Sequence, residues 1–220
     1  MSQTGMQPGA ALLPRIPDES VCSTLLAQIP PQVAAHSRAV QRLALEMCDA
    51  LAAHGVRLNR ALLSAAALLH DIAKELPRDR LLQIFTENAI IAGNAAQRPA
   101  PVWHGAAAAI LAQTQYGVDD GEILSAIRCH TTGRPGMTKL DKIIYLADMA
   151  SYERTYPEAE QLRRHALADL DRTAIEGLGL SIAWLKAGGK PVDEESLLAY
   201  ADLRARYYGG RTSEQTAGEP

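Results

Sequence analysis

The sequence predicts an all-α protein, a single bundle of helices. Ala and Leu dominate the 220 residues, and aromatic residues make up only 5% of them, a composition that favours helices over a β-sandwich. Apolar residues recur at helical spacing along most of the chain, whereas the alternation with a period of two that marks half-buried strands is scarce. These observations together predict almost no strand.

The first two helices are predicted from their end residues. The first opens at prolines 30–31 and stops at Gly55, because proline suits the first turn of a helix and glycine the turn that follows its end. Asn59 is a good N-cap for the second helix, predicted over residues 60–74. This second helix is apolar nearly all round, so we expect it to be the buried central one.

Six further helices follow from the same kinds of signal. Gly117 ends one of them, Asp119 and Asp120 place negative charge at the positive end of the next, and Thr138 caps another. The six helices are predicted over residues 79–91, 103–116, 119–130, 138–149, 157–186 and 193–207.

The two ends of the chain differ in composition from the body. Residues 1–20 are rich in Gly, Pro and Gln and predict a flexible lead-in, and residues 209–220 predict a disordered tail. No internal repeat or linker separates them, so we expect one domain over residues 21–208.

Charge and targeting signals narrow the class of protein. A formal net charge of −3 argues against a nucleic-acid partner, because proteins that bind phosphate backbones are normally basic. Neither a secretory signal nor a run of 18 apolar residues occurs, so we expect a cytoplasmic protein without a membrane partner. Cys22, Cys48 and Cys129 are odd in number and far apart, which favours reduced, partly buried thiols.

Histidines and aspartates carry the chemical signal. Burying His70 and Asp71 beside leucines is costly unless a cation binds them, because the cation supplies the compensating charge. A single histidine on an apolar helix is more often a hydrogen-bonded core residue than a ligand. The ordered set is more informative, because its members fall on separate predicted elements whose ends can converge. The set comprises His36, His70, Asp71, His104, His130 and Asp148.

The order His, His-Asp, Asp resembles the HD-domain phosphohydrolases, a helical superfamily in which these four residues bind a divalent metal. Three further motifs sharpen the resemblance: His70-Asp71-Ile72-Ala73-Lys74, Trp103-His104-Gly105, and the stretch 127–137 followed by 140–148, which includes His-Thr-Thr-Gly-Arg-Pro. Over residues 31–200 the sequence is similar to the YqeK-type HD proteins. The activity of that family is symmetrical hydrolysis of dinucleoside tetraphosphates, such as diadenosine tetraphosphate, to two nucleoside diphosphates.

The resemblance implies an HD-domain bundle with the metal site at converging helix ends. His36, His70, Asp71 and Asp148 would hold one divalent metal ion, and His104 and His130 would join Asp71 in holding a second. Asp71 would thus bridge the two ions. The family points to iron, and manganese is the alternative, since mixed imidazole and carboxylate ligands suit both better than magnesium.

Basic and hydroxyl side chains near these ligands are candidates for phosphate binding. Lys74 lies four residues after His70, on the same face of the predicted helix, and is a candidate catalytic residue together with Asp71. The loop after His130 could form an anion-binding turn with an arginine clamp. The candidate substrate-binding residues are Lys74, Thr131, Thr132, Gly133, Arg134 and Arg154.

The sequence departs from the family pattern at one position near the last ligand. After Asp148 the family usually continues Glu-Pro-Gly-Arg, whereas this chain has Ser151 at the acidic position and keeps Arg154.

The leading hypothesis is a symmetrical bis(5′-nucleosyl)-tetraphosphatase with a nucleotide substrate. The alternatives are an HD-type phosphomonoesterase or phosphodiesterase acting on another nucleotide, and a non-catalytic nucleotide-binding regulatory module. A homodimer is left open.

Overall fold

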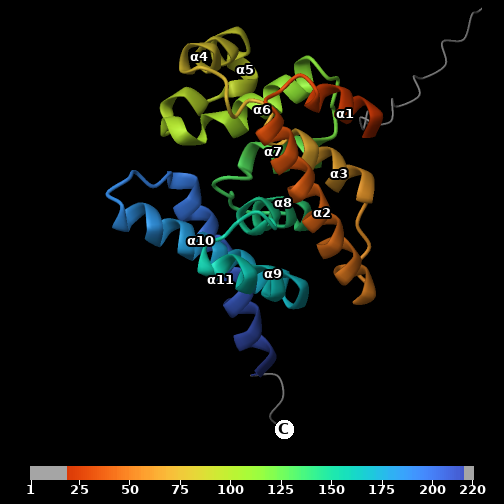
Figure 1. The fold of residues 1–220 in the computed structure, drawn as a ribbon. Helices are drawn as coiled ribbons and strands as arrows, with labels where there is room; N and C mark the ends of the chain where they lie inside the picture. Colours follow the sequence, from red (N-terminus) through yellow and green to blue (C-terminus); the bar gives the residue numbers. More distant parts are fainter. Residues whose placement is uncertain (1–18, 216–220) are drawn as a thin grey trace, which may run out of the picture.

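A computed structural model of the protein describes residues 19–215, and all regular elements within that range are helices (Figure 1). The all-α prediction is therefore confirmed. The elements are α1 (Glu19–Leu26), α2 (Pro31–Ala53), α3 (Arg60–Leu69), α4 (Arg78–Glu87), α5 (Ala89–Ala92), the 3₁₀ turns η1 (Ala95–Gln97) and η2 (Ala100–Val102), α6 (Trp103–Thr114), α7 (Gly121–Cys129), α8 (Lys139–Ala150), α9 (Pro157–Ala168), α10 (Leu170–Ala187) and α11 (Glu194–Gln215).

Capping side chains fix where several helices begin. Asn59 accepts a hydrogen bond from the amide of Ala61, and Asp120 accepts from two amides in the first turn of α7. Thr138 and Asp141 form a reciprocal capping box at the start of α8, each side chain accepting from the other's backbone N–H. The predicted starts of these three helices are confirmed because the sequence signal and the physical cap are the same residue.

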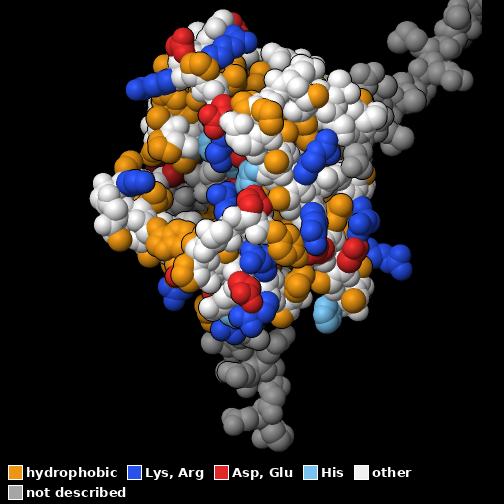
Figure 2. All heavy atoms as spheres, in the orientation of Figure 1, with side chains coloured by type: hydrophobic (Ala, Val, Ile, Leu, Met, Phe, Trp, Pro, Cys, Tyr) orange, Lys and Arg blue, Asp and Glu red, His pale blue; other side chains and the backbone are white. Residues whose placement is uncertain are grey.

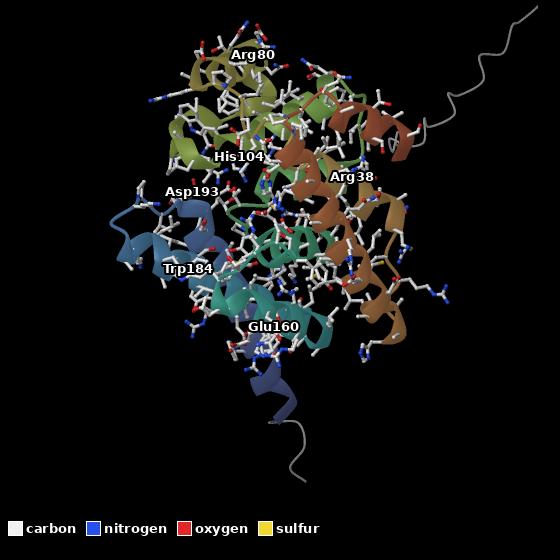
Figure 3. All side chains as sticks on the ribbon, in the orientation of Figure 1. Arg38, Arg80, His104, Glu160, Trp184 and Asp193 are labelled. Carbon is white, nitrogen blue, oxygen red and sulfur yellow. The ribbon has the colours of Figure 1, made fainter. Side chains whose placement is uncertain are left out.

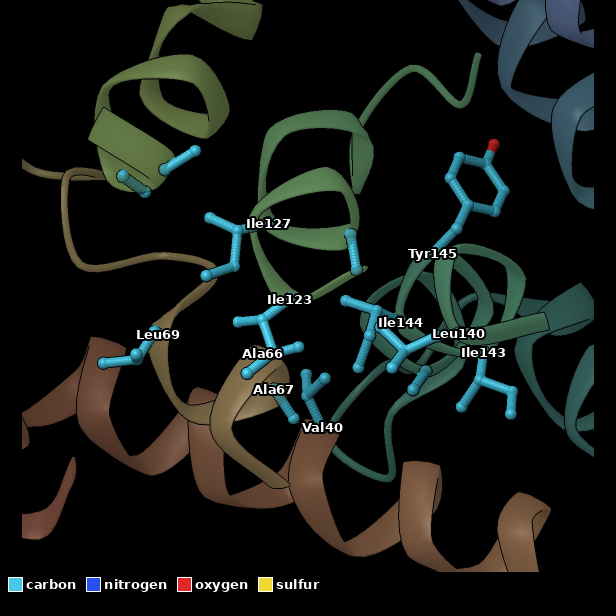
Figure 4. Close-up of a cluster of buried hydrophobic side chains, with 14 of the residues drawn as sticks. Val40, Ala66, Ala67, Leu69, Ile123, Ile127, Leu140, Ile143, Ile144 and Tyr145 are labelled. Atoms are coloured by element: carbon cyan, nitrogen blue, oxygen red, sulfur yellow. The ribbon is translucent and has the colours of Figure 1, made fainter. Parts of the chain in front are cut away.

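The core gathers around α8 and α3. Helix α8 packs against α2, α7, α9 and α10, and α3 packs against α1, α2 and α7. Figure 4 shows Val40 from α2, Ala66 from α3, Ile127 from α7 and Ile144 from α8 meeting in one apolar cluster. Helix α3 is buried over most of its length, as its nearly unbroken apolar sequence predicts.

Three predicted helices end earlier or are divided. Helix α3 stops at Leu69, five residues before the predicted end, and the chain then runs through turns from His70 to Glu75. The helix predicted over 79–91 breaks at Asn88, and the one predicted over 157–186 breaks at Asp169. Asp169 has an extended backbone and caps α10 by accepting from the amide of Arg172 at 3.0 Å.

The ends of the domain also differ from the prediction. Helix α1 was not predicted and begins at Glu19, within the segment 1–20 expected to be a flexible lead-in. Helix α11 continues to Gln215, past the expected end at residue 207 and into the segment expected to be a disordered tail. Residues 1–18 and 216–220 lie outside the described residues.

Within the described residues, none of the helices combines the length and the apolar character that a membrane span requires. None of the cysteines Cys22, Cys48 and Cys129 takes part in a disulfide within the described residues, and all three are buried, more fully than the partly buried thiols expected.

Candidate metal centre

Helix ends bring the six predicted ligands to one place. His70 and His130 are the C-cap residues of α3 and α7, and His104 is the second residue of α6. Asp148 lies near the end of α8, and His36 lies in the second turn of α2. Asp71 follows His70 in the turn after α3. All six side chains are thus positioned by the start or the end of a helix, as predicted.

Asp71 stands between two groups of imidazoles, one facing each of its oxygens. Its Oδ1 atom lies 3.3 Å from Nε2 of His104 and 3.3 Å from Nε2 of His130. Its Oδ2 atom lies 3.4 Å from Nε2 of His70 and 3.6 Å from Nε2 of His36. A carboxylate with a separate ligand group at each oxygen is the arrangement that a bridge between two cations requires.

Asp148 completes the group on the Oδ2 side. Its Oδ1 atom lies 2.9 Å from Nε2 of His36 and 4.0 Å from Nε2 of His70. Ligand atoms of His36, His70 and Asp148 lie within 4.8 Å of one another, and so do those of His70, Asp71 and His130. Each of these two sets is small enough to surround one metal ion.

Backbone carbonyls fix the tautomer of three imidazoles. Nδ1 of His70 lies 2.7 Å from the carbonyl oxygen of Ala67, and Nδ1 of His130 lies 2.7 Å from that of Ile127. Nδ1 of His104 likewise lies 3.1 Å from a carbonyl oxygen. Since a carbonyl can only accept, each Nδ1 carries the proton, and the neutral imidazole presents the lone pair of Nε2 to the centre.

The converging atoms therefore fit a cation. Nε2 of His104 and Nε2 of His130 lie 3.1 Å apart, although both are acceptors when the rings are neutral. Nε2 of His70 and Oδ1 of Asp71 are buried and have no hydrogen-bond partner. Buried acceptors that face each other are costly unless a cation or protons lie between them. The donor set, imidazole nitrogen and carboxylate oxygen, is one that divalent transition metals bind.

The pKa values of Asp71 and Asp148 agree with a cation site at this centre. Burial alone would raise the pKa of Asp71, but His70, His104 and His130 outweigh it and hold that pKa far below its usual range. The pKa of Asp148 is also lowered, against burial, chiefly by the hydrogen bond with His36. Both carboxylates are therefore ionised, as metal ligands must be.

Glu153 supports His36 in a way that sequence reasoning missed. Nδ1 of His36 donates to Oε1 of Glu153, which orients the ring so that Nε2 faces Asp148. Ser151 occupies the position where the family usually has an acidic residue, and its hydroxyl donates to the same Glu153 oxygen at 2.8 Å. Ser151 therefore holds the Glu153 carboxylate in place beside His36.

Two basic residues flank the ligands. Nζ of Lys74 lies 3.0 Å from Oδ2 of Asp71, and Nη2 of Arg154 lies 2.8 Å from Oδ1 of Asp148. The contact of Lys74 arises from the turn after α3 and not from the predicted helix face, because α3 ends at Leu69. Both side chains remain about one-third exposed, so each can also meet a ligand in solvent.

In the loop after His130, one residue borders the metal centre and the next two make hydrogen bonds within the fold. Thr131 borders the centre, and its buried Oγ1 atom has no hydrogen-bond partner. The amides of Thr132 and Gly133 both donate to the carbonyl of Cys129, so these N–H groups are not free for the predicted anion-binding turn. The hydroxyl of Thr132 accepts from Arg98 and donates to the carbonyl of Gly133.

Arg134 does not form the predicted phosphate clamp. Its Nη2 atom lies 2.7 Å from Oδ2 of the buried Asp141, and its Nε donates to the hydroxyl of Ser125 at 2.8 Å. Asp141 belongs to the capping box of α8. The guanidinium therefore joins the 131–136 loop to the middle of α7 and the start of α8, and it is not among the residues that line the spaces beside the metal centre.

The centre opens into a hollow on the surface. Figure 2 shows imidazoles at the floor of this hollow, with Lys and Arg side chains around it. Two spaces adjoin the ligands there. One, of about 210 Å³, is lined by residues that include His130, Asp148 and Arg154, and the other, of about 280 Å³, is lined by residues that include His36, Asp71 and Arg154. A ligand can therefore reach the centre from two sides.

A fold of helices with His and Asp ligands at converging ends defines a class of metal-binding helical domain. The model of the HD domain family matches residues 33–153, which is more than half of the chain and contains all six ligands. The chain belongs to the HD domain family.

Similar proteins extend the comparison beyond the matched region. A symmetrical bis(5′-nucleosyl)-tetraphosphatase of Bacillus subtilis is 33% identical over 75% of this chain and 86% of its own length. A protein of the same name from Halalkalibacterium halodurans is 32% identical over 63% of this chain and 73% of its own length. The resemblance expected from the motifs is confirmed.

A solved structure shares most of this fold. The crystal structure of a protein from Clostridium acetobutylicum, named as a predicted HD superfamily hydrolase involved in NAD metabolism, superposes with a TM-score of 0.77. It is 29% identical in sequence, and the match covers 86% of this chain and 97% of that one.

Proposed function

We propose that the protein hydrolyses dinucleoside tetraphosphates symmetrically, releasing two nucleoside diphosphates. The observation that carries the proposal is the position of Asp71 between two pairs of histidines, one pair facing each of its oxygens, in a centre that two spaces adjoin. The similarity to two symmetrical tetraphosphatases over most of their length supports the same substrate class.

The residues around the centre have distinct parts in this proposal. His36, His70, Asp71 and Asp148 hold one divalent ion, and His104 and His130 with Asp71 hold another. Bound in pairs, such ions neutralise phosphoryl oxygens and lower the pKa of a water molecule towards neutrality. We propose iron, because a ligand set rich in imidazole suits iron, or manganese, better than magnesium.

Lys74 and Arg154 bind the phosphate chain in this proposal. Each is ion-paired with a metal-ligating carboxylate and partly exposed in the hollow, so each can donate to a phosphate oxygen. Arg154 borders both spaces beside the centre and suits the middle of a tetraphosphate that passes between them. Thr131 offers a hydroxyl without a partner on one side.

Product analysis tests the reaction. The protein, purified anaerobically and analysed for metal content, is incubated with diadenosine tetraphosphate in water enriched in oxygen-18. Symmetrical cleavage breaks the bridge between the two central phosphorus atoms, so ADP is the only product and one of each two ADP molecules carries the label. AMP together with ATP, or phosphate from a mononucleotide, would point to another HD-type activity, and binding without products to a regulatory module.

Two variants locate the chemistry. Asp71→Ala removes the proposed bridge, so we expect activity to fall by roughly three orders of magnitude or more and the metal content to drop. The matched control is His54→Ala, an exposed histidine at the end of α2 that should leave both unchanged. Full metal content in Asp71→Ala would show that Asp71 is not a bridge.

A further inference from the structure

The two spaces beside the metal centre differ in the chemistry of their walls. The first, here called the aromatic pocket, is bordered by Trp184, Tyr156, Tyr145 and Met149 together with Ser181 and Thr131. The second, here called the polar cleft, is bordered by Gln32, Lys74, Glu75 and Glu153, and no aromatic side chain is among the described residues that line it. Only the aromatic pocket offers a flat apolar surface.

Trp184 presents that surface. It lies on α10, and its side chain is 42% exposed, whereas the other tryptophan, Trp103, is 4% exposed. Figure 3 shows Trp184 on α10 below His104, which lies on α6. Trp rings are large enough that most of their surface is normally covered, so a half-exposed indole beside a metal centre points to a ligand.

The indole is held in a fixed orientation. The ring of Tyr156 meets it edge to face, with centroids 4.9 Å apart and planes at 85°. Tyr156 is itself fixed, because its hydroxyl donates to the carbonyl oxygen of Met149. A stacking surface that is already ordered loses little conformational entropy when a planar ligand binds to it.

Polar groups border the same pocket. The hydroxyl of Tyr145 donates to Oγ of Ser181 at 3.2 Å, which leaves the O–H of Ser181 to donate elsewhere. Oγ1 of Thr131 is buried and without a partner. A flat ring system with polar edges, joined to a chain that reaches the metal centre, would satisfy both the indole and these hydroxyls.

We infer that the aromatic pocket binds one nucleobase of the substrate by stacking it on Trp184, so that Trp184 is the residue that recognises the nucleoside. This inference rests on the proposed function in taking a nucleotide as the ligand. The polar cleft then receives the other half of the substrate without a stacking partner. Trp184 does not touch the reacting bond, so it contributes to binding and not to the chemical step.

Binding of ADP, compared with binding of pyrophosphate, tests the inference. Both ligands carry a diphosphate, and only ADP carries a base. Stacking on an aromatic side chain accounts for about tenfold or more in affinity. Trp184→Ala should therefore weaken ADP about tenfold in titration calorimetry and leave pyrophosphate within twofold, while Trp184→Phe should retain most of the ADP affinity. Equal losses for both ligands, or no loss for ADP, would overturn the inference.

Fluorescence supplies a readout that does not require hydrolysis. In Trp103→Phe only Trp184 remains as a tryptophan reporter, and a stacked base should quench it, whereas pyrophosphate should not. Tyr208→Ala is the matched control, because Tyr208 is a half-exposed aromatic residue on α11 that does not border the pocket. It should leave ADP binding unchanged. An absence of quenching at saturating ADP would show that the base lies elsewhere.

The outcomes separate this inference from the proposed function. If diadenosine tetraphosphate is cleaved to ADP but Trp184→Ala has the same KM as the parent, the function stands and the base pocket is wrong. If ADP binds through Trp184 but the tetraphosphate is not cleaved, the pocket stands and the function is wrong. With both correct, Trp184→Ala raises KM about tenfold and changes kcat less than threefold.

Discussion

Glu153 is the residue whose role follows from its contacts alone. Its carboxylate accepts from Nδ1 of His36 and from the hydroxyl of Ser151. Hydrogen bonds of this kind orient a metal-binding imidazole and raise its basicity. Burial would lower the pKa of His36, but hydrogen bonds with Asp148 and then Glu153 raise it above the ordinary value. Glu153 therefore tunes the histidine without touching the metal position.

Glu153→Gln tests this role. The amide keeps the size of the side chain but loses the charge, so we expect the affinity for the ion beside His36 to fall roughly 10- to 100-fold. The measurement is competition with a chelator of known affinity, with activity followed in parallel. Glu160→Gln, an exposed glutamate on α9, is the control. If the two variants lose metal equally, the contact with His36 is irrelevant to binding.

Cys129 yields a prediction about reactivity. It is 2% exposed, and burial raises the pKa of its thiol well above the ordinary value, with Asp141 adding to the effect. Since the thiolate is the reactive form, Cys129 should resist alkylation in the native protein. Iodoacetamide labelling followed by mass spectrometry should modify it only after unfolding. Modification of native Cys129 within minutes would show that α7 opens readily.

Residue types and residue contacts differ in how far the sequence predicts them. The six ligands were predicted because imidazoles and carboxylates beside apolar residues, in an order that resembles a known family, allow few other interpretations. Glu153 and Trp184 carried no such signal. A glutamate after a helix or a tryptophan within one is ordinary, and only the direction of the side chain reveals its role. Arg134 shows the reverse case, in which a plausible phosphate ligand pairs with Asp141 instead.

At the scale of elements, α6 and α7 meet through a glycine. A Cβ atom on Gly105 would lie 2.9 Å from the carbonyl oxygen of Arg128, 3.3 Å from that of Ile127 and 3.4 Å from Cε1 of His130. Two of these atoms belong to the backbone and cannot move aside. The absence of a side chain at Gly105 therefore lets the start of α6 approach the end of α7, and brings His104 towards His130.

Gly105→Ala should separate these two helices. We expect a loss of about 1–3 kcal/mol in the free energy of unfolding, typical of overpacking, together with weaker binding of the ion shared by His104 and His130. Chemical denaturation and metal titration measure the two effects. Gly121→Ala at the first residue of α7 is the control, since a Cβ there meets nothing within 4 Å. Equal stability of the two variants would contradict the close-approach argument.

Helix starts were more predictable than helix ends. A capping residue such as Asn59 or Thr138 bonds to an amide two or three positions along the chain, so its residue type alone indicates where the helix begins. The end of α3 at Leu69 is set instead by the placement of His70 and Asp71 at the centre, which is a tertiary effect. The break at Asp169, which caps α10, was not predicted and lies inside the range expected to be one long helix. Helix α1 lacks a strong signal of either kind.

For the whole molecule, the centre links the elements on which its ligands lie. A ligand that binds only the folded state stabilises it, so removal of the metal should lower the melting temperature. We expect differential scanning calorimetry to show a drop of several degrees after treatment with a chelator, reversed by adding the metal back. An unchanged melting temperature in a protein shown to have lost its metal would mean that the ions do not bind at this centre.

Acid should weaken the same stabilisation. The pKa of His36 is raised in the metal-free protein by its hydrogen bonds with Asp148 and Glu153, against burial, so protons compete with the cation there more strongly as the pH falls. The difference in melting temperature between the loaded and the metal-free protein should therefore shrink from about pH 8 to about pH 6. A difference that grows on acidification would contradict the assignment of neutral histidines as ligands.

The spacing of the ligands along the chain has a consequence for biosynthesis. His36 and Asp148 are 112 positions apart yet share one side of the centre. A nascent polypeptide cannot complete that side until α8 has left the ribosome, so metal uptake follows the formation of most of the domain. The apolar cluster of α2, α3, α7 and α8 therefore has to hold these helices together before the metal ions bind.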